Sequence, residues 1–238
     1  MKVTLLSHTI DPEAVVAAAI NQCYSAKGGE ELKENISTEK RERLIGIVMN
    51  SGHLSTIEHA SFTFAVEGVS RALTHQLVRH RVASFSQQSQ RYVKFKNGEF
   101  DYIIPPKISA DKNLKKKFEQ KIEGLGRFYE EMLNSKIPAE DARSILPNAC
   151  ETKIVFTMNA RSLLNFFEHR LCIRAQQEIR EMAGKMLDLV NPVAPNIFKF
   201  AGPSCETQKI CWEGDLSCGK WKGIRGGELR VRNSGGDK

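Results

Sequence analysis

The run from Arg79 to Tyr92 concentrates side chains that bind anions. It holds three arginines, one histidine, three serines and three glutamines, and it contains no Asp or Glu. An arginine fork can grip a phosphate through two hydrogen bonds, and serine hydroxyls and loop amides can complete such a site. A basic surface loop would explain the charge, but not the density of Ser and Gln. Val82, Ala83 and Phe85 indicate partial burial, where an unpaired arginine is costly. We therefore expect a bound anion or another chain to face this run.

The elements before the run predict how it is positioned. Phe62, Phe64 and Val66 alternate with more polar residues, which indicates a half-buried strand. A helix is expected from Ser70. Gln76, Arg79 and His80 would share one edge of it, at positions i, i+3 and i+4. The helix would then bring three polar side chains to one place.

A second polar segment runs from Asn159 to Arg170 and follows an alternating strand around Ile154 to Met158. On a helix, Arg161 and Asn165 lie one turn apart, whereas Arg170 points about 140° away from Asn165. If both ends serve active sites, one helix serves more than one site, which favours an oligomer. The alternative for Arg170 is an exposed helix charge.

The remaining pattern predicts both strands and helices. A strand is expected at Lys2–Ser7, a short strand or a lead-in segment at Tyr102–Ile104, and a loop at Gly28–Glu34. Helices are expected over four ranges: residues 11–23, 38–50, 111–134 and a closing helix around 179–190. From these residues alone the chain is an anion-binding protein of mixed α and β structure. Neither a Rossmann fingerprint nor a P-loop is present.

Composition and charge also limit the kinds of ligand and location that fit this protein. Of the net charge of +7, six cations and two acids between residues 219 and 238 contribute +4, so the body is only mildly basic. This suits a nucleotide better than a long nucleic acid. No apolar stretch is long enough to span a bilayer and the N-terminus lacks a signal-peptide pattern, so a cytoplasmic location is expected. We expect mobility past Gly223.

The six cysteines form no C-x-x-C pair and are expected to be free thiols. Cys205, Cys211 and Cys218 cluster near the C-terminus, where a zinc site is conceivable but lacks a fourth ligand. We predict no metal, and no covalent cysteine chemistry.

Arg79-His80-Arg81, followed after seven residues by Ser89 and then Arg91, resembles the signature of the flavin-dependent thymidylate synthases, the ThyX family. Asn159–Arg170 is similar to that family's second segment. The resemblance covers residues 1–205. Residues 206–238 would be a basic, Cys- and Gly-containing C-terminal extension.

The resemblance implies an α+β fold with a mixed or antiparallel central sheet flanked by helices, and active sites at subunit interfaces of a homotetramer. It implies reductive methylation of dUMP to dTMP. The carbon donor would be 5,10-methylenetetrahydrofolate, and the hydride would come from FAD reduced by NADPH.

The resemblance also assigns residues to the two ligands. The flavin would be bound by eight residues: Ser55, Arg79, His80, Arg81, Gln87, Asn159, Arg161 and Asn165. The dUMP phosphate and sugar would be bound by Gln76, Arg79, Gln87, Gln88, Ser89, Gln90 and Arg91, and by Arg143 from another subunit. Arg170, the predicted catalytic residue, would pair with the uracil and favour its ionised N3. His53 would lie near the folate.

This sequence departs from the family at two positions. Gln87 replaces a glutamate of some members, so acid chemistry there is not expected, and Arg174 replaces a histidine and receives no role. Ser89 could be a nucleophile only if a neighbouring base took its proton, and no base lies nearby in the sequence. We therefore interpret Ser89 as a phosphate or sugar ligand.

Two further classes stay open. A nucleic-acid-binding protein would use the basic run and tail, and would bind no coloured cofactor. A metal hydrolase would use His53, His59, His75 and His80.

Overall fold

The computed structural model describes residues 1–223, and the segment past Gly223, for which we expected mobility, lies outside them. Within the chain, contacts divide the residues into two compact units. Unit 1 comprises Met1–Val3, Ala65–Arg81 and Phe85–Phe156. Unit 2 comprises Thr4–Phe64, Val82–Ser84 and the chain from Thr157 onward. The predicted boundary at residue 205 remains a prediction.

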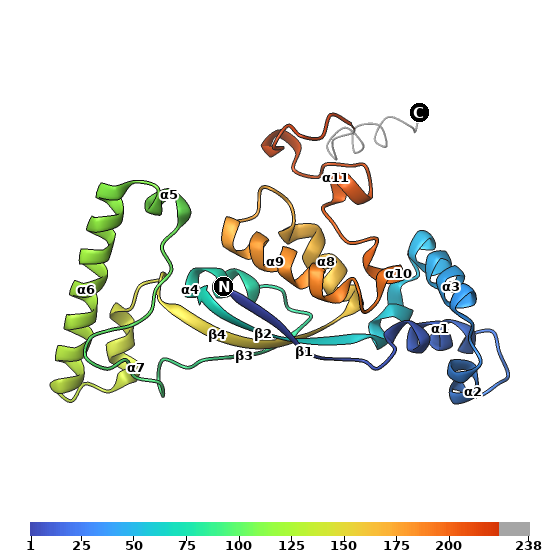
Figure 1. Cartoon of the computed structure of the whole chain (residues 1–238), viewed down its shortest axis with the longest axis horizontal. Coiled ribbons are helices and arrows are strands. Elements are labelled where there is room, and N and C mark those ends of the chain that lie inside the picture. The colour runs from blue at the N-terminus through green and yellow to red at the C-terminus, as the bar shows by residue number, and fades with distance from the viewer. Residues whose placement is uncertain (224–238) are drawn as a thin grey trace, which may run out of the picture. The chain divides into compact units, whose positions relative to one another are not determined.

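A four-stranded sheet has the order β1-β2-β4-β3 (Figure 1). Its strands are β1 (Lys2–His8), β2 (Ser61–Ser70), β3 (Ser84–Gln87) and β4 (Glu151–Asn159). Neighbouring strands are antiparallel, as three contacts illustrate. The Thr9 amide donates to the Ser61 carbonyl at 3.0 Å, the Thr63 and Thr157 hydroxyls are 2.9 Å apart, and the Gln88 amide donates to the Lys153 carbonyl at 2.9 Å. The predicted α+β fold with helices flanking a central sheet is confirmed.

The helices of unit 1 lie between β2 and β4 in the chain. They are α4 (Arg71–Leu77), α5 (Pro106–Ser109), α6 (Lys112–Asn134), α7 (Ala139–Ala142) and the short 3-10 helix η2 (Arg143–Ile145). α6 confirms the predicted long helix. The Asp111 side chain caps it by accepting from the amides of Asn113 and Leu114 at 2.9 and 3.0 Å. Its apolar stripe helps to bury a cluster that includes Phe100, Ile122 and Cys150.

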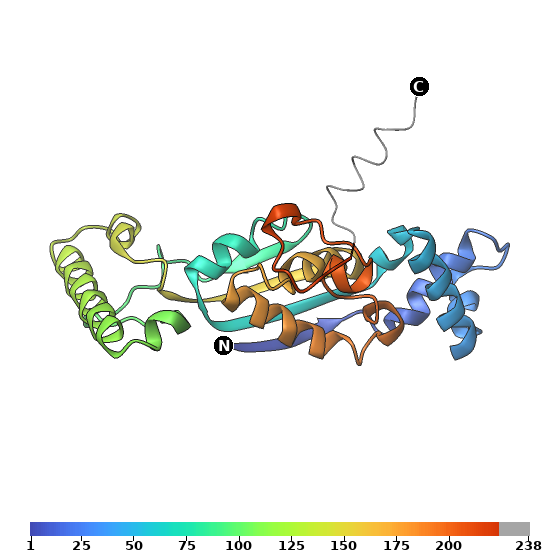
Figure 2. The ribbon, with the colours of Figure 1, turned by 90° about the horizontal axis from the view of Figure 1, so that it is seen from above.

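Unit 2 contains helices from both ends of the chain. They are α1 (Pro12–Gln22), α2 (Gly29–Glu34), α3 (Thr38–Ser51), η1 (Leu54–His59), α8 (Ala160–Arg170), α9 (Gln177–Val190), α10 (Pro195–Phe198), α11 (Ser204–Thr207) and η3 (Gly214–Leu216). α8 and α9 pack side by side (Figure 2). Phe198 makes edge contacts with Phe62 and Phe167, with ring centroids 5.3 and 6.1 Å apart. These contacts tie β2 and α8 to α10.

Three sequence expectations need correction. Gly28–Glu34 is not a loop, because α2 forms there with Leu32 buried and with charges that suit its ends: Glu30 in the first turn and Lys33 in the last. α4 ends at Leu77, so Arg79 and His80 follow the helix instead of sharing its edge with Gln76. Tyr102 pairs only through an isolated bridge to Cys150 and belongs to no strand.

Candidate active site

The polar run leaves α4 through a turn and then joins the sheet. The amides of Arg79 and His80 donate to the carbonyls of Gln76 and Leu77 at 3.3 and 3.0 Å. Arg79 and Arg81 are exposed, while Gln76 and His80 are half-buried. Neither Arg79 nor Arg81 forms an ion pair within residues 1–223. Their positive charges are therefore available to a ligand.

Two buried hydroxyl groups of unit 1 hold the Gln87 side chain in place. Its side-chain Nε2 donates to the hydroxyls of Thr74 and Thr152, at 2.8 and 3.2 Å, and both threonines are buried. Because these bonds use the amide nitrogen, the carbonyl oxygen of Gln87 is left as the group that can meet a ligand. Thr74 and Thr152 are supporting residues that the sequence analysis missed.

The segment after β3 is a tight turn. The Arg91 amide donates to the Ser89 hydroxyl at 3.2 Å, and the Val93 amide donates to the Ser89 carbonyl at 3.0 Å. The Arg91 guanidinium lies over the Tyr92 ring, 5.3 Å from its centroid. No hydrogen bond joins the Ser89 hydroxyl to a His, Asp or Glu side chain within the described residues. The arrangement thus offers no base for a nucleophilic serine.

A cavity of about 360 Å³ in unit 1 brings together two residues predicted to bind dUMP, Gln90 and Arg143, and one that was not predicted, Arg71. His75, Glu140, Ser144, Leu146, Pro147 and Asn148 complete its lining. The Gln90 side chain donates to the Cys150 sulfur at 3.4 Å, and Arg143 Nε donates to the Glu140 main-chain carbonyl at 3.2 Å. These bonds fix two polar side chains at the cavity.

Unit 2 holds the other predicted residues, on η1 and α8. Ser55 and Asn165 are exposed. The Asn159 side chain caps α8 by accepting from the Ser162 amide at 2.9 Å. Arg161 forms an ion pair with Glu58 at 2.6 Å, a partner that the sequence analysis missed.

Arg170 ends α8, where a cation is favoured by the helix dipole. It is half-buried, and burial lowers the pKa of its guanidinium. The helix therefore holds a partly desolvated cation at its C-terminal end.

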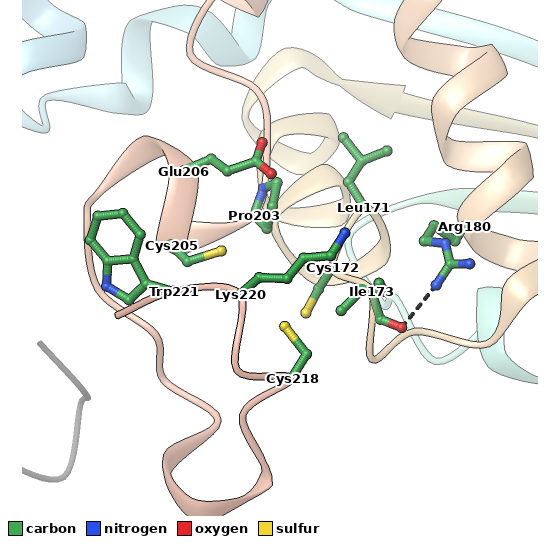
Figure 3. A pocket seen from close by; sticks show the side chains of 10 residues that line it. All are labelled: Leu171, Cys172, Ile173, Arg180, Pro203, Cys205, Glu206, Cys218, Lys220 and Trp221. Atoms are coloured by element: carbon green, nitrogen blue, oxygen red, sulfur yellow. Dashed lines mark hydrogen bonds between the residues drawn. The ribbon is translucent and has the colours of Figure 1, made fainter. Parts of the chain in front are cut away.

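A second cavity, of about 430 Å³, lies in unit 2, where Cys172, Cys205 and Cys218 contribute to its lining (Figure 3). At its edge Arg180 donates to the Ile173 carbonyl at 2.8 Å. All six cysteines are free thiols, as predicted. Within residues 1–223 no three His, Cys, Asp or Glu side chains are arranged to hold a metal ion. The zinc and metal-hydrolase alternatives thus receive no support from the described residues.

The arginines and carboxamides clustered on this antiparallel α+β fold are typical of proteins that bind nucleotides and anionic cofactors. A family model described as "Thymidylate synthase complementing protein" matches residues 4–196. The chain belongs to this family, that of the flavin-dependent thymidylate synthases.

Its relatives match over most of their length. A flavin-dependent thymidylate synthase of Clostridium tetani is 52% identical over 236 residues, covering 92% of this chain and 94% of the relative. One from Geobacter sulfurreducens is 51% identical, with the same coverage. One from Sulfolobus acidocaldarius is 42% identical, covering 86% of this chain and 78% of the relative. None of these findings supports the nucleic-acid-binding alternative. No helix in the described part of the chain is long and apolar enough to cross a membrane.

Proposed function

We propose that this protein is a flavin-dependent thymidylate synthase that converts dUMP to dTMP by reductive methylation. The observation that carries this proposal is the family match over residues 4–196, together with 52% identity to a relative of that name. The one-carbon donor is 5,10-methylenetetrahydrofolate, the flavin is FAD and the reductant is NADPH. The working protein is a cytoplasmic homotetramer.

The predicted flavin residues fit an anionic dinucleotide. Arg79 and Arg81 are exposed cations without an ion-pair partner in residues 1–223, and arginine forks suit a pyrophosphate. His80, Gln87, Asn159, Arg161 and Asn165, with the Ser55 hydroxyl, add donors and acceptors for the remainder of the cofactor. Once reduced by NADPH, the bound flavin would supply the hydride that reduces the transferred carbon.

The dUMP phosphate and sugar are held by seven residues of one chain and by one of another. Gln76, Arg79, Gln87, Gln88, Ser89, Gln90 and Arg91 belong to the first set. Arg143 is contributed by another subunit to the site that Arg170 completes. When guanidinium and amide groups hold the phosphate through hydrogen bonds, they also orient the attached uracil.

Arg170 acts on the uracil itself. A fixed cation beside the ring stabilises the negative charge of the ionised N3, so the ring becomes a better carbon nucleophile. Because α8 places this guanidinium in a partly desolvated position, its electric field is screened less than at an open surface. The charge on Arg170 thus contributes to catalysis without a covalent bond between protein and substrate.

The proposal is tested by the visible absorption spectrum of the purified protein and by chromatography of the released cofactor. We expect a flavin spectrum, release of FAD, and bleaching when NADPH is added without air. A colourless protein that takes up no added flavin would contradict the proposal. Release of FMN alone would contradict the choice of FAD.

A further inference from the structure

The hydroxyl of Thr74 takes part in two hydrogen bonds with opposite roles. Thr74 lies on α4 and is buried. Its hydroxyl donates to the Arg71 main-chain carbonyl at 3.1 Å and accepts from Gln87 Nε2 at 2.8 Å. A hydroxyl has a single proton, and here the Arg71 carbonyl, which cannot donate, accepts it. The Thr74 oxygen therefore presents only lone pairs to Gln87.

These bonds determine which way the Gln87 amide faces. An amide has a donating nitrogen and an accepting oxygen, and exchanging the two would place two acceptors 2.8 Å apart. The hydroxyl of Thr152, which is also buried, accepts from the same nitrogen at 3.2 Å. Both protons of the nitrogen are thus used. The two threonines together hold the amide in one orientation.

The Gln87 side-chain oxygen is the end of the amide that stays open. Within residues 1–223 no hydrogen bond is donated to this oxygen, and it is not a buried atom that lacks a partner. Gln87 is half-buried at the last position of β3, directly before Gln88 and Ser89. Because both protons of its nitrogen are engaged, Gln87 can offer a ligand only an acceptor. A ligand group that meets this oxygen must be an N–H or O–H donor.

We propose that Thr74 and Thr152 are positioning residues, which orient Gln87 so that its side-chain oxygen accepts from an N–H or O–H group of dUMP. This inference rests on the proposed function. It gives Gln87 one hydrogen-bonding direction and assigns that direction to two buried side chains.

The same contacts give a reason for glutamine at position 87. A carboxylate there has no proton to give to either threonine hydroxyl. Thr74 would have to turn its own proton away from the Arg71 carbonyl to meet a carboxylate. The threonines on α4 and β4 thus match the amide that this chain carries.

The test is a double-mutant cycle in which dUMP binding is measured at saturating FAD. Thr74→Val removes the hydroxyl at nearly constant shape and should weaken dUMP binding roughly 3- to 10-fold, the effect of one neutral hydrogen bond. In the Gln87→Ala background the same substitution should have no further effect, because the amide that Thr74 orients is absent.

Two variants serve as controls. Thr74→Ser keeps the hydroxyl and should bind dUMP like the parent protein. Thr207→Val removes an exposed hydroxyl of α11 that donates to the Pro203 carbonyl, and it should leave dUMP binding unchanged.

Three outcomes would overturn the inference. The first is unchanged dUMP binding in Thr74→Val. The second is equal weakening with and without Gln87, which a purely structural role of Thr74 predicts. The third is a Thr74→Ser protein that binds dUMP as weakly as Thr74→Val. If Thr74→Val does not fold, the same cycle with Thr152→Val decides. A parent protein that binds no dUMP would instead refute the proposed function.

Discussion

At the scale of the residue, the position of Arg170 at the end of α8 decides what its charge can stabilise. We predict that Arg170→Ala lowers the rate of dTMP formation at least about 100-fold, because a preorganised charge at a reacting centre contributes on that order. The flavin should remain bound, since other residues hold it. Loss of flavin in the variant, measured by its absorption, would show that Arg170 belongs to the cofactor site. Arg174→Ala, an exposed neighbour, is the matched control.

Ser89 gives a second residue-scale prediction. Because no base contacts its hydroxyl within the described residues, Ser89→Ala should keep substantial turnover at saturating dUMP while raising KM roughly 10-fold through the lost phosphate or sugar contact. Steady-state kinetics with varied dUMP measures both constants. Complete loss of kcat, with dUMP binding retained, would restore the nucleophile interpretation.

Cys150 links one buried thiol to the pH dependence of folding. Burial raises its pKa to about 11, from an ordinary value of 9.0. The unfolded chain therefore ionises first. The neutral thiol contributes up to ~3 kcal/mol to the free energy of unfolding. This contribution is fully present below pH 9 and is lost as the pH rises through 11. Urea denaturation across this window should give a smaller pH-dependent loss for Cys150→Ala than for Cys23→Ala, whose thiol is exposed. Equal losses would contradict this assignment.

The sequence indicated candidate site residues, but not the residues that contact them and hold them in place. The Arg79–Arg91 pattern and the Asn159–Arg170 segment are local in sequence, so they can be recognised there. Arg71 and the Glu58–Arg161 pair were missed, since the contacts that reveal them join residues 17 and 103 positions apart. Only the cation at a helix start hinted at Arg71.

At the scale of the element, side-chain caps fix where the longer helices begin. Asp111 marks the start of α6, and Ser37 marks that of α3, where its side chain accepts from the Lys40 amide. α2 was missed because six residues give too short a pattern, and one buried leucine stabilises it. The early end of α4 was also missed, since no Gly or Pro follows Leu77 to mark it.

The contact between α6 and the loop at Gly98 makes an element-scale prediction. A Cβ at Gly126 would lie 1.9 Å from the Gly98 carbonyl oxygen, whereas one at Gly124 would meet nothing closer than 3.9 Å. Gly126→Ala should therefore lower the free energy of unfolding by about 1–3 kcal/mol. Gly124→Ala should raise it by up to ~1 kcal/mol, as expected in a helix. Chemical denaturation of both variants decides, and equal effects would argue against this close contact.

At the scale of the whole molecule, shared sites make oligomers of different variants informative. Arg143→Ala and Arg170→Ala homo-oligomers should each be nearly inactive. If every site takes Arg143 from one chain and Arg170 from another, random mixed oligomers regain complete sites at about a quarter of positions. Activity measured after co-refolding should rise accordingly. No recovery would indicate sites built by a single chain.

The central claim is that this chain makes dTMP with a flavin, and one measurement addresses it most directly. Purified, flavin-depleted protein is supplied with dUMP, 5,10-methylenetetrahydrofolate and NADPH, and dTMP is quantified by chromatography with and without added FAD. Our account predicts dTMP only in the reaction that contains FAD. Product formed equally well in both reactions, or in neither, would contradict it.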